Sequence, residues 1–288
     1  MNPWILASRP KTLPAAISPV LLGLALAYHN SQFNLFVGSL TMVASVLIQI
    51  GTNFANDAYD FLSGVDDDNR IGPKRATNSG LLSVKNVLKK MWLVFALSLI
   101  IGCYLTYIGG WPIVLIGSLA ILSGIAYTGG PYPLGYNGLG DIFVFIFFGV
   151  IAVPGTYYLQ TNIVNYESIL LGILSGSFST AILIVNNIRD IDTDKSSGKN
   201  TLAVKFGKEI CVIEYVLMMI FAFSIPIYMT IFLGFHTSML LVLLTIPIAI
   251  KLILELHFGL GDKLNSVLEK TARLYMLVTL ILTFAIVS

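Results

Sequence analysis

The sequence predicts an all-α integral membrane protein with nine transmembrane helices and one domain that covers residues 1–288. Three observations support this prediction. Hydrophobic residues make up 56% of the chain and charged residues only 11%, whereas a soluble domain carries about 25% charged residues. Apolar stretches long enough to cross a bilayer recur along the chain. The basic residues fall in alternate connections between these stretches.

The nine predicted spans are separated by connections of two kinds. Connections after the first, third, fifth and seventh spans are short and nearly uncharged, and the others are longer and more polar. A chain that crosses the membrane repeatedly places alternate connections on the same side, so this pattern supports the assignment. The predicted spans are 13–29, 35–56, 87–108, 111–128, 141–161, 167–188, 211–233, 237–256 and 271–287.

The charge distribution predicts the orientation. All 17 Lys and Arg residues lie in the N-terminal segment or in and around the longer connections. Because basic loops stay in the cytoplasm, we expect the N-terminus inside and the C-terminus outside. Every acidic residue except Glu167 lies on the same side, so chemistry is expected at the cytoplasmic face. No secretory signal peptide is expected, because no cleavage pattern follows the apolar run that starts at Leu13.

Some conspicuous residues in or beside the apolar spans are expected to serve packing alone. Cys103 and Cys211, the two cysteines, are predicted to be small buried hydrophobic residues. Gly172 and Gly176, four residues apart in the sixth span, are predicted to permit close helix packing. The three histidines share no metal-ligand spacing, so neither a zinc nor a haem site is expected.

The first polar motif lies at the end of the second span. If the helix continues past the apolar run, Asn53, Asn56, Asp57 and Asp60 share one helix face, because they are spaced at i, i+3, i+4 and i+7. Asp66 follows beyond a predicted helix break. An acidic stripe at a membrane boundary is costly and indicates a functional site.

The second polar motif lies at the end of the sixth span. Asn186, Asp190 and Asp194 repeat at i, i+4 and i+8, with Asn187 and Arg189 beside them. The second and sixth spans are four crossings apart, so they run in the same direction and end at the same face. This relation suggests an internal four-helix repeat, at about 13–140 and 141–270.

Carboxylates gathered from two helix ends predict a divalent cation site. Such a cluster repels itself unless cations lie between its members. Hard oxygen ligands suit Mg²⁺, which is bound by one or two carboxylates together with substrate phosphates. The pattern therefore predicts a phosphate-bearing substrate bridged by Mg²⁺. The predicted metal ligands are Asp57, Asp60, Asp66, Asp190 and Asp194.

Basic residues near both motifs are candidates to bind the remaining phosphate oxygens. These residues are Lys74, Arg75, Arg189, Lys195 and Lys199. Simpler explanations exist for single residues, since acidic loops beside membranes are often only solvated. Asn186 and Asn187 alone would suit hydrogen bonding between helices. Two polar stripes on parallel spans are harder to explain in this way.

The two motifs together resemble those of the UbiA superfamily of intramembrane prenyltransferases. The resemblance rests on the Asn56-Asp57-x-x-Asp60 and Asp190-x-x-x-Asp194 patterns and extends over the whole chain. It implies a UbiA-type bundle of nine helices with both motifs at the cytoplasmic face. Many superfamily members carry another Asp four residues after Asp60, whereas this chain has Gly64 there.

Longer strings narrow the resemblance to the 1,4-dihydroxy-2-naphthoate polyprenyltransferase branch of menaquinone synthesis. The strings cover residues 56–66, 70–75, 127–136 and 187–202. Hydroxybenzoate-type relatives tend to carry a basic pair in the loop around 127–136, which here has none. The resemblance implies a bacterial or archaeal plasma membrane protein with its active site on the cytoplasmic side. It implies no nucleic-acid partner.

The family reaction implied by this resemblance joins a polyprenyl diphosphate to an aromatic ring. Mg²⁺ held by the catalytic residues Asp57, Asp60, Asp190 and Asp194 would neutralise the departing diphosphate. The acceptor 1,4-dihydroxy-2-naphthoate would be prenylated with loss of CO₂ and a proton, which gives demethylmenaquinone. The residues expected to contact the substrates are Asn53, Asn56, Lys74, Arg75, Tyr132, Asn187, Arg189 and Lys199.

The sequence is compatible with three other functions. The first is a related prenyltransferase whose acceptor is hydroxybenzoate, homogentisate or a glycerol phosphate lipid. The second is a cation transporter, although transporter sites lie near the membrane midplane and not at helix ends. The third is a non-catalytic quinone- or lipid-binding protein, which would need no pair of acidic motifs.

Overall fold

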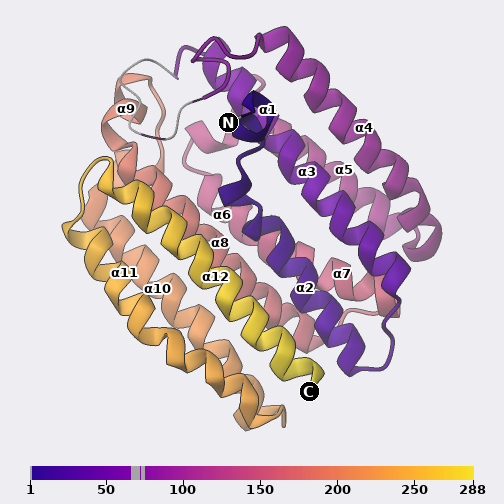
Figure 1. Ribbon diagram of the computed structural model, residues 1–288. Coiled ribbons are helices and arrows are strands. Elements are labelled where there is room, and N and C mark those ends of the chain that lie inside the picture. Colours follow the sequence, from indigo (N-terminus) through magenta and orange to yellow (C-terminus); the bar gives the residue numbers. More distant parts are fainter. Residues whose placement is uncertain (1, 66–71, 73–74) are drawn as a thin grey trace.

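The computed structural model describes residues 2–65, 72 and 75–288, and the regular structure within these ranges is helical (Figure 1). Two of the predicted site residues, Asp66 and Lys74, lie outside the described residues. The N- and C-termini lie at opposite ends of the helical bundle (Figure 1).

In the described part of the chain, seven helical segments have the length and composition of a membrane span. An eighth span is added if the segment Pro3–Thr12, which contains α1 and η1, forms one bent span with α2. The bend between the two parts is 51°. The fourth predicted span, 111–128, forms α5, Trp111–Ala126, which is a shorter apolar helix. Each predicted span is therefore helical, while the count of nine crossings stays a prediction.

Helix bounds follow the predicted spans and extend several of them. The N-terminal half contains α1 (Pro3–Ser8), η1 (Pro10–Thr12), α2 (Pro14–His29), α3 (Leu35–Leu62), α4 (Val84–Gly109), α5 (Trp111–Ala126) and η2 (Leu134–Tyr136). Next come α6 (Gly140–Phe145), η3 (Ile146–Ile151), α7 (Ala152–Thr161), α8 (Tyr166–Arg189) and α9 (Ile191–Ser196). The chain ends with α10 (Leu202–Phe232), η4 (Thr237–Thr245), α11 (Ile246–Phe258) and α12 (Lys263–Val287).

Helix α3 continues well past the predicted end of its apolar run near residue 56. It ends at Leu62, where Gly64 takes a φ of +69° and its N–H bonds to the carbonyl of Phe61 at 3.1 Å. The N–H of Val65 bonds to the carbonyl of Asp60 at 3.0 Å, so backbone groups at the helix end are satisfied. The prediction that the first polar motif is helical is confirmed.

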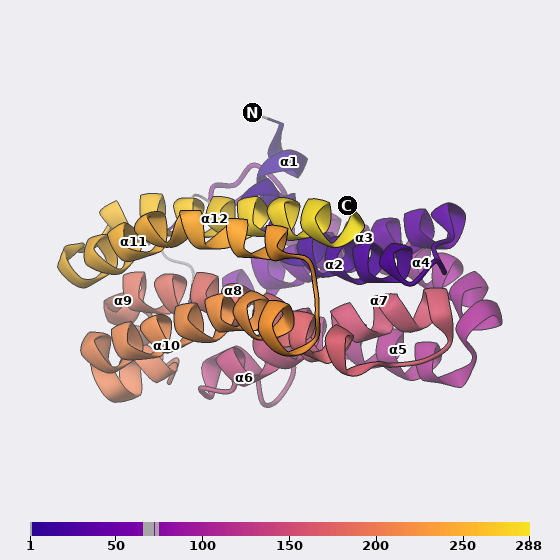
Figure 2. The ribbon, with the colours of Figure 1, turned by 90° about the horizontal axis from the view of Figure 1, so that it is seen from below.

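The helices form two layers, and α8 lies at the centre of the bundle. Figure 2 shows α11, α12, α2, α3 and α4 in one layer and α10, α8, α6, α7 and α5 in the other. Helix α8 packs against α2, α6, α7, α10 and α12, and 83% of the residues in its apolar 18-residue stretch are buried. This burial explains why its apolar run is interrupted only by small and polar residues, and it places the second acidic motif in the middle of the bundle.

A segment of π-helix, η3, packs tightly against α8. A Cβ atom on Gly149 of η3 would lie 2.5 Å from the carbonyl oxygen of Gly172 and 2.6 Å from the Cα of Gly176. The prediction that Gly172 and Gly176 permit close packing is confirmed. The Ser175 hydroxyl donates to the carbonyl of Phe148 within η3 at 2.5 Å, which satisfies a backbone acceptor in this irregular segment.

The two cysteines differ in burial. Cys211 is buried, as predicted, with 2% of its surface exposed. Cys103 is exposed, so the prediction that it is buried was wrong. Its position on α4 faces a gap between helices instead of the packed interface with α3, which an apolar sequence pattern alone does not distinguish.

Replacing Gly149 by Ala should destabilise the fold by about 1–3 kcal/mol, because the added methyl group meets the backbone of α8. The control is Gly102→Ala on α4, where a Cβ meets no heavy atom within 4 Å and improved helix propensity favours stability. Unfolding midpoints in detergent test this prediction. Equal midpoints for the two variants would contradict it.

Candidate active site

A polar cavity of about 200 Å³ lies at the end of α3 and α8. Most of its lining comes from the N-terminal bend, α3, the loop that carries residues 127–136, and the segment from α8 to residue 201. Ala15 of α2, Arg75, Val144 and Phe148 of the α6–η3 segment, and Leu268 of α12 complete it. Both acidic motifs contribute to this lining. The structure therefore brings together the two polar stripes that the sequence predicts on separate helices.

The first motif presents three side chains to the polar cavity. Asn53, Asn56 and Asp60 line it, while Asp57 is buried beside it with 1% of its surface exposed. The Thr77 hydroxyl lies 3.0 Å from Oδ1 of Asp57, and Oδ2 has no hydrogen-bond partner among the described residues. A buried carboxylate oxygen without a partner fits a position that binds a cation.

Three of the described side chains contact the Asp60 carboxylate. Arg75 donates from Nη2 to Oδ2 at 2.6 Å, and the Tyr136 hydroxyl donates to Oδ1 at 2.7 Å. The ammonium group of Lys199 lies 3.6 Å from the same Oδ1. Both Asp60 and Arg75 are more than nine-tenths buried, so these contacts replace the hydration that the charges lose.

The second motif is organised by an arginine fork. Arg189 donates from Nε and Nη2 to the two carboxylate oxygens of Asp190, at 2.8 and 2.6 Å. It also donates to the side-chain oxygens of Asn186, at 2.8 Å, and of Asn265, at 2.9 Å. Arg189 was expected to contact the substrate. These contacts instead hold its side chain outside the cavity lining. Its role in the structure is to orient Asp190, the residue at which α8 ends.

Lys199 connects the two motifs. Its Nζ atom lies 3.6 Å from Asp60 Oδ1 and 3.7 Å from Asp194 Oδ1, and it sits over the ring of Tyr136 at 4.6 Å. The N–H of the next residue, Asn200, bonds to the carbonyl of Tyr136 at 2.7 Å. One cation thus holds carboxylates from both helix ends and the loop between them.

The structure places most of the predicted residues in the polar cavity. Tyr132 is the exception among the described loop residues, because it is 60% exposed and lies outside the lining. Tyr127 and Tyr136 of the same loop face the cavity instead. The predicted residues that line the cavity are Asn53, Asn56, Asp60, Arg75, Asn187, Asp190, Asp194 and Lys199.

The N-terminal bend supplies residues that the sequence prediction missed. Arg9 lines the cavity with φ +49° and ψ +68°, a left-handed conformation that is uncommon outside glycine. Asn53 holds this bend by donating to the carbonyl of Ser8 at 2.8 Å and to the hydroxyl of Thr12 at 3.1 Å. Gln49 precedes Asn53 by one helical turn and also lines the cavity, so extending the polar stripe backwards would have found it.

Tyr127 stands at the inner end of the polar cavity. Gly135 and Gly140 pack against the ring and hydroxyl, where a Cβ atom on either glycine would lie 2.9 Å from Tyr127.

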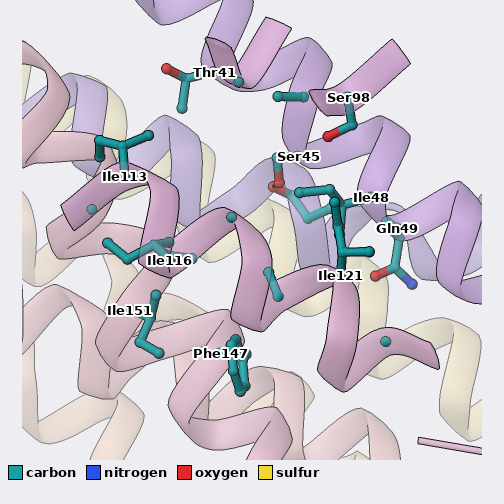
Figure 3. Close-up of a pocket in the computed structure, with 18 of the residues that line it drawn as sticks. Thr41, Ser45, Ile48, Gln49, Ser98, Ile113, Ile116, Ile121, Phe147 and Ile151 are labelled. Carbon is teal, nitrogen blue, oxygen red and sulfur yellow. Dashed lines mark hydrogen bonds between the residues drawn. The ribbon is translucent and has the colours of Figure 1, made fainter. Parts of the chain in front are cut away.

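An apolar groove of about 520 Å³ lies next to the polar cavity (Figure 3). It runs between α2, α3, α4, α5 and the α6–η3–α7 segment, and side chains such as Ile116, Ile121 and Phe147 line it. The two spaces share lining residues, so they lie next to each other, one charged and the other apolar. The shared residues are Gln49, Thr52, Tyr127, Val144 and Phe148.

The donor set fits Mg²⁺ held jointly with a phosphate-bearing substrate. Within the described residues, no three His, Cys, Asp or Glu side chains converge on one point where they could hold a metal ion. Mg²⁺ does not require such a cage, because it is bound by one or two carboxylates plus phosphate oxygens and waters. Three carboxylates that line one cavity, Asp60, Asp190 and Asp194, with an unpartnered oxygen on Asp57 buried beside it, meet that requirement.

Comparisons with known proteins give a consistent result. Residues 16–277 match the UbiA prenyltransferase family. The chain is 42% identical over 212 residues to a 1,4-dihydroxy-2-naphthoate octaprenyltransferase of Haemophilus influenzae, which covers 71% of this chain and 69% of that protein. It is 29% identical to UbiA prenyltransferase domain-containing protein 1 of Xenopus tropicalis, over 99% of this chain and 81% of that protein.

Solved structures share the fold. A UbiA homologue from Archaeoglobus fulgidus bound to DMAPP and Mg²⁺ superposes with a TM-score of 0.71 over 99% of this chain and 98% of that chain, at 17% identity. The same homologue bound to GPP and Mg²⁺ gives a TM-score of 0.69 at 18% identity, over 99% of each chain. These similarities confirm the predicted all-helical fold.

Replacing Arg189 by Met should destabilise the protein by on the order of 3 kcal/mol, because the buried Asp190 carboxylate loses its partner. Adding Asp190→Asn to that variant should recover part of the loss. Arg273→Met is the control, since the 75% exposed Arg273 pairs with Glu269 at the surface and should change stability little. Denaturant unfolding in detergent measures all three, and equal effects of the two Arg variants would refute the prediction.

Proposed function

The chain belongs to the UbiA prenyltransferase family, and we propose that it transfers a polyprenyl group from a polyprenyl diphosphate to 1,4-dihydroxy-2-naphthoate. The observation that carries this proposal is that the polar cavity and the apolar groove lie next to each other and share five lining residues. A prenyl diphosphate has the same two parts, a highly charged head and a long apolar tail. Relatives named for this acceptor, including those of Haemophilus influenzae and Bacillus subtilis, support the choice of substrate.

The charged head belongs in the polar cavity. Arg75 and Lys199 line that cavity and supply cationic hydrogen-bond donors for diphosphate oxygens. Mg²⁺ held by Asp57, Asp60, Asp190 and Asp194, with Asp66 a further candidate ligand, would neutralise the charge that builds on the leaving oxygens. Asp60 and Asp194 both lie within 4 Å of Lys199, so the basic residues keep the two motifs together before substrate arrives.

We assign the acceptor carboxylate to Arg9. This guanidinium lines the cavity on its N-terminal side, as do Thr12, Gln49 and Asn53, and it interacts electrostatically with the Asp57 carboxylate. A planar guanidinium recognises a carboxylate through two parallel hydrogen bonds. The left-handed backbone at Arg9, held by Asn53, fixes where that group enters the cavity.

In the proposed reaction, the acceptor's own carboxylate is the group that the prenyl group replaces on the ring. The electron-rich ring carbon that bears the carboxylate attacks C1 of the prenyl group, and the C1–O bond breaks as diphosphate leaves. The ring–carboxylate bond then breaks, CO₂ departs, and its electron pair restores the aromatic ring. The product of transfer is the reduced, quinol form of demethylmenaquinone, and a separate two-electron oxidation gives the quinone.

Water has to be excluded while the allylic carbon is electron-poor. The groove beyond Tyr127 is lined mainly by aliphatic and aromatic side chains, including Val144 and Phe148 at its mouth. This arrangement keeps the reacting carbon on the apolar side of the phenol and the diphosphate on the polar side. The positive-inside pattern supports a cytoplasmic position for the polar cavity, where soluble acceptor and diphosphate are accessible.

The deciding assay supplies membranes that contain the protein with radiolabelled polyprenyl diphosphate, Mg²⁺ and one acceptor at a time. We expect a prenylated, decarboxylated product from 1,4-dihydroxy-2-naphthoate and none from 4-hydroxybenzoate or homogentisate. Product formed only from another aromatic acceptor would refute the proposed identity of the acceptor and would still support prenyl transfer. Binding of diphosphate without transfer to any acceptor would overturn the reaction itself.

Asp57→Asn and Asp190→Asn should each lower transfer by about 10³-fold, because each removes a charge that holds Mg²⁺. Asp192→Asn is the matched control, since Asp192 is exposed on α9 and lies outside the cavity. Chelation should stop the wild-type reaction and added Mg²⁺ should restore it. Normal transfer by either cavity variant, or loss of transfer in Asp192→Asn alone, would refute the assigned metal site.

Arg9→Ala should raise the KM for the acceptor by about tenfold or more, with a smaller change in the KM for prenyl diphosphate. Arg9→Lys should recover only part of the loss, because an ammonium lacks the planar fork. Lys11→Ala, two residues away with its side chain 64% exposed, is the control. An unchanged acceptor KM in Arg9→Ala would show that another group binds the carboxylate.

A further inference from the structure

One wall of the apolar groove is the π-helical segment η3, which contributes Phe147, Phe148 and Ile151 to the lining. Figure 3 shows Phe147 and Ile151 on this wall. Phe148 also lines the polar cavity, so its ring lies at the junction of the two spaces. A π-helix is a rare conformation that is frequently found at functional sites. The place of the Phe148 ring therefore depends on the contacts that other helices make with η3.

A hydrogen bond from α8 holds η3 at Phe148. The Ser175 hydroxyl lies 2.5 Å from the carbonyl oxygen of Phe148 and 2.5 Å from the hydroxyl of Tyr275 on α12. A carbonyl oxygen only accepts, so Ser175 donates its one hydroxyl proton to Phe148. The Ser175 oxygen must then accept from the Tyr275 hydroxyl. The hydrogen bonds therefore run in one direction, from Tyr275 through Ser175 to the backbone of η3.

The Tyr275 hydroxyl determines which way Ser175 points. A serine inside a helix commonly donates to the carbonyl four residues earlier, and Ser177 on the same helix does so, to Ile173 at 2.8 Å. Ser175 donates across to η3 instead. The Tyr275 ring is fully buried and stacks on Phe178, with ring centroids 5.2 Å apart and planes at 11°. Its hydroxyl is thereby held in place, and without it Ser175 is free to turn back to its own helix.

We propose that Tyr275 is a positioning residue for prenyl transfer, which acts through Ser175 to keep the Phe148 ring at the junction of the polar cavity and the apolar groove. This inference rests on the proposed function, in which the reacting allylic carbon lies at that junction and water is kept away from it. Tyr275 and Ser175 line neither space. Their effect on the reaction therefore passes through η3.

A displaced Phe148 ring gives a distinct side reaction. Water that reaches the junction attacks C1 of the prenyl group, and the C1–O bond breaks as diphosphate leaves. The water oxygen bonds to C1, one of its protons goes to diphosphate, and the product is a prenyl alcohol in place of the prenylated ring. The ratio of prenyl alcohol to prenylated acceptor therefore measures how well water is excluded. This ratio does not depend on how much of the protein is folded.

The first experiment measures this ratio in membranes supplied with radiolabelled octaprenyl diphosphate, Mg²⁺ and 1,4-dihydroxy-2-naphthoate. Tyr275→Phe and Ser175→Ala should each raise it about three- to tenfold, the factor that corresponds to the loss of one hydrogen bond. Tyr215→Phe is the matched control, because Tyr215 is equally buried and its hydroxyl pairs with Thr271, at 3.0 Å, between α10 and α12. An unchanged ratio in Tyr275→Phe, or an equal rise in Tyr215→Phe, would overturn the positioning role.

The second experiment does not require turnover. A para-fluorophenylalanine placed at residue 148 reports the surroundings of that ring through its fluorine NMR resonance. We expect Tyr275→Phe and Ser175→Ala to shift or broaden the resonance and Tyr215→Phe to leave it unchanged. The same resonance in the wild type and all three variants would overturn the link from Tyr275 to Phe148. A resonance that responds as expected, in a wild-type protein that transfers the prenyl group to no acceptor, would refute the proposed function and still support that link.

Discussion

Carboxylates buried at the end of membrane helices must be neutralised, and the polar architecture of this protein follows from that requirement. Asp60 and Asp190 are each about 95% or more buried and each forms an ion pair with an arginine at 2.6 Å. The cost of desolvating such charges is recovered only where the partner geometry is good and further hydrogen bonds are made. Lys199 then places a single cation between Asp60 and Asp194, and the two halves of the bundle meet at that point.

The same charges prepare the site for its substrate. Basic residues that neutralise the motif carboxylates are also suited to bind diphosphate oxygens. Mg²⁺ can therefore replace them on the carboxylates while they bind the diphosphate, and no buried charge is left without a partner. Arg189 differs from Arg75 because it lies outside the cavity lining, where it pairs with Asp190 and donates to Asn186 and Asn265. This separation between an orienting arginine and a cavity-lining arginine is a consequence of the central, buried position of α8.

Division of the site into charged and apolar parts depends on the helix packing. The π-helical segment η3 brings Phe147 and Phe148 into the groove, and its close approach to α8 requires glycine at residues 149, 172 and 176. Tyr127, at the junction, belongs to both linings. A prenyl diphosphate would therefore lie across this junction, with its reacting carbon where charge is supplied from one side and water is excluded from the other.

The sequence by itself determined the membrane class, the helical segments, the continuous polar face of α3 and the close packing at Gly172 and Gly176. These features follow from composition and from the helical period, which fixes the relative direction of side chains within one helix. The tertiary structure decided which loop residues face the cavity: Tyr136 turns inward, Tyr132 turns outward, and Arg9 enters from a bend far away in the sequence. It also decided that Cys103 borders an open gap. Such outcomes depend on contacts between distant segments, and no periodicity within a single segment encodes them.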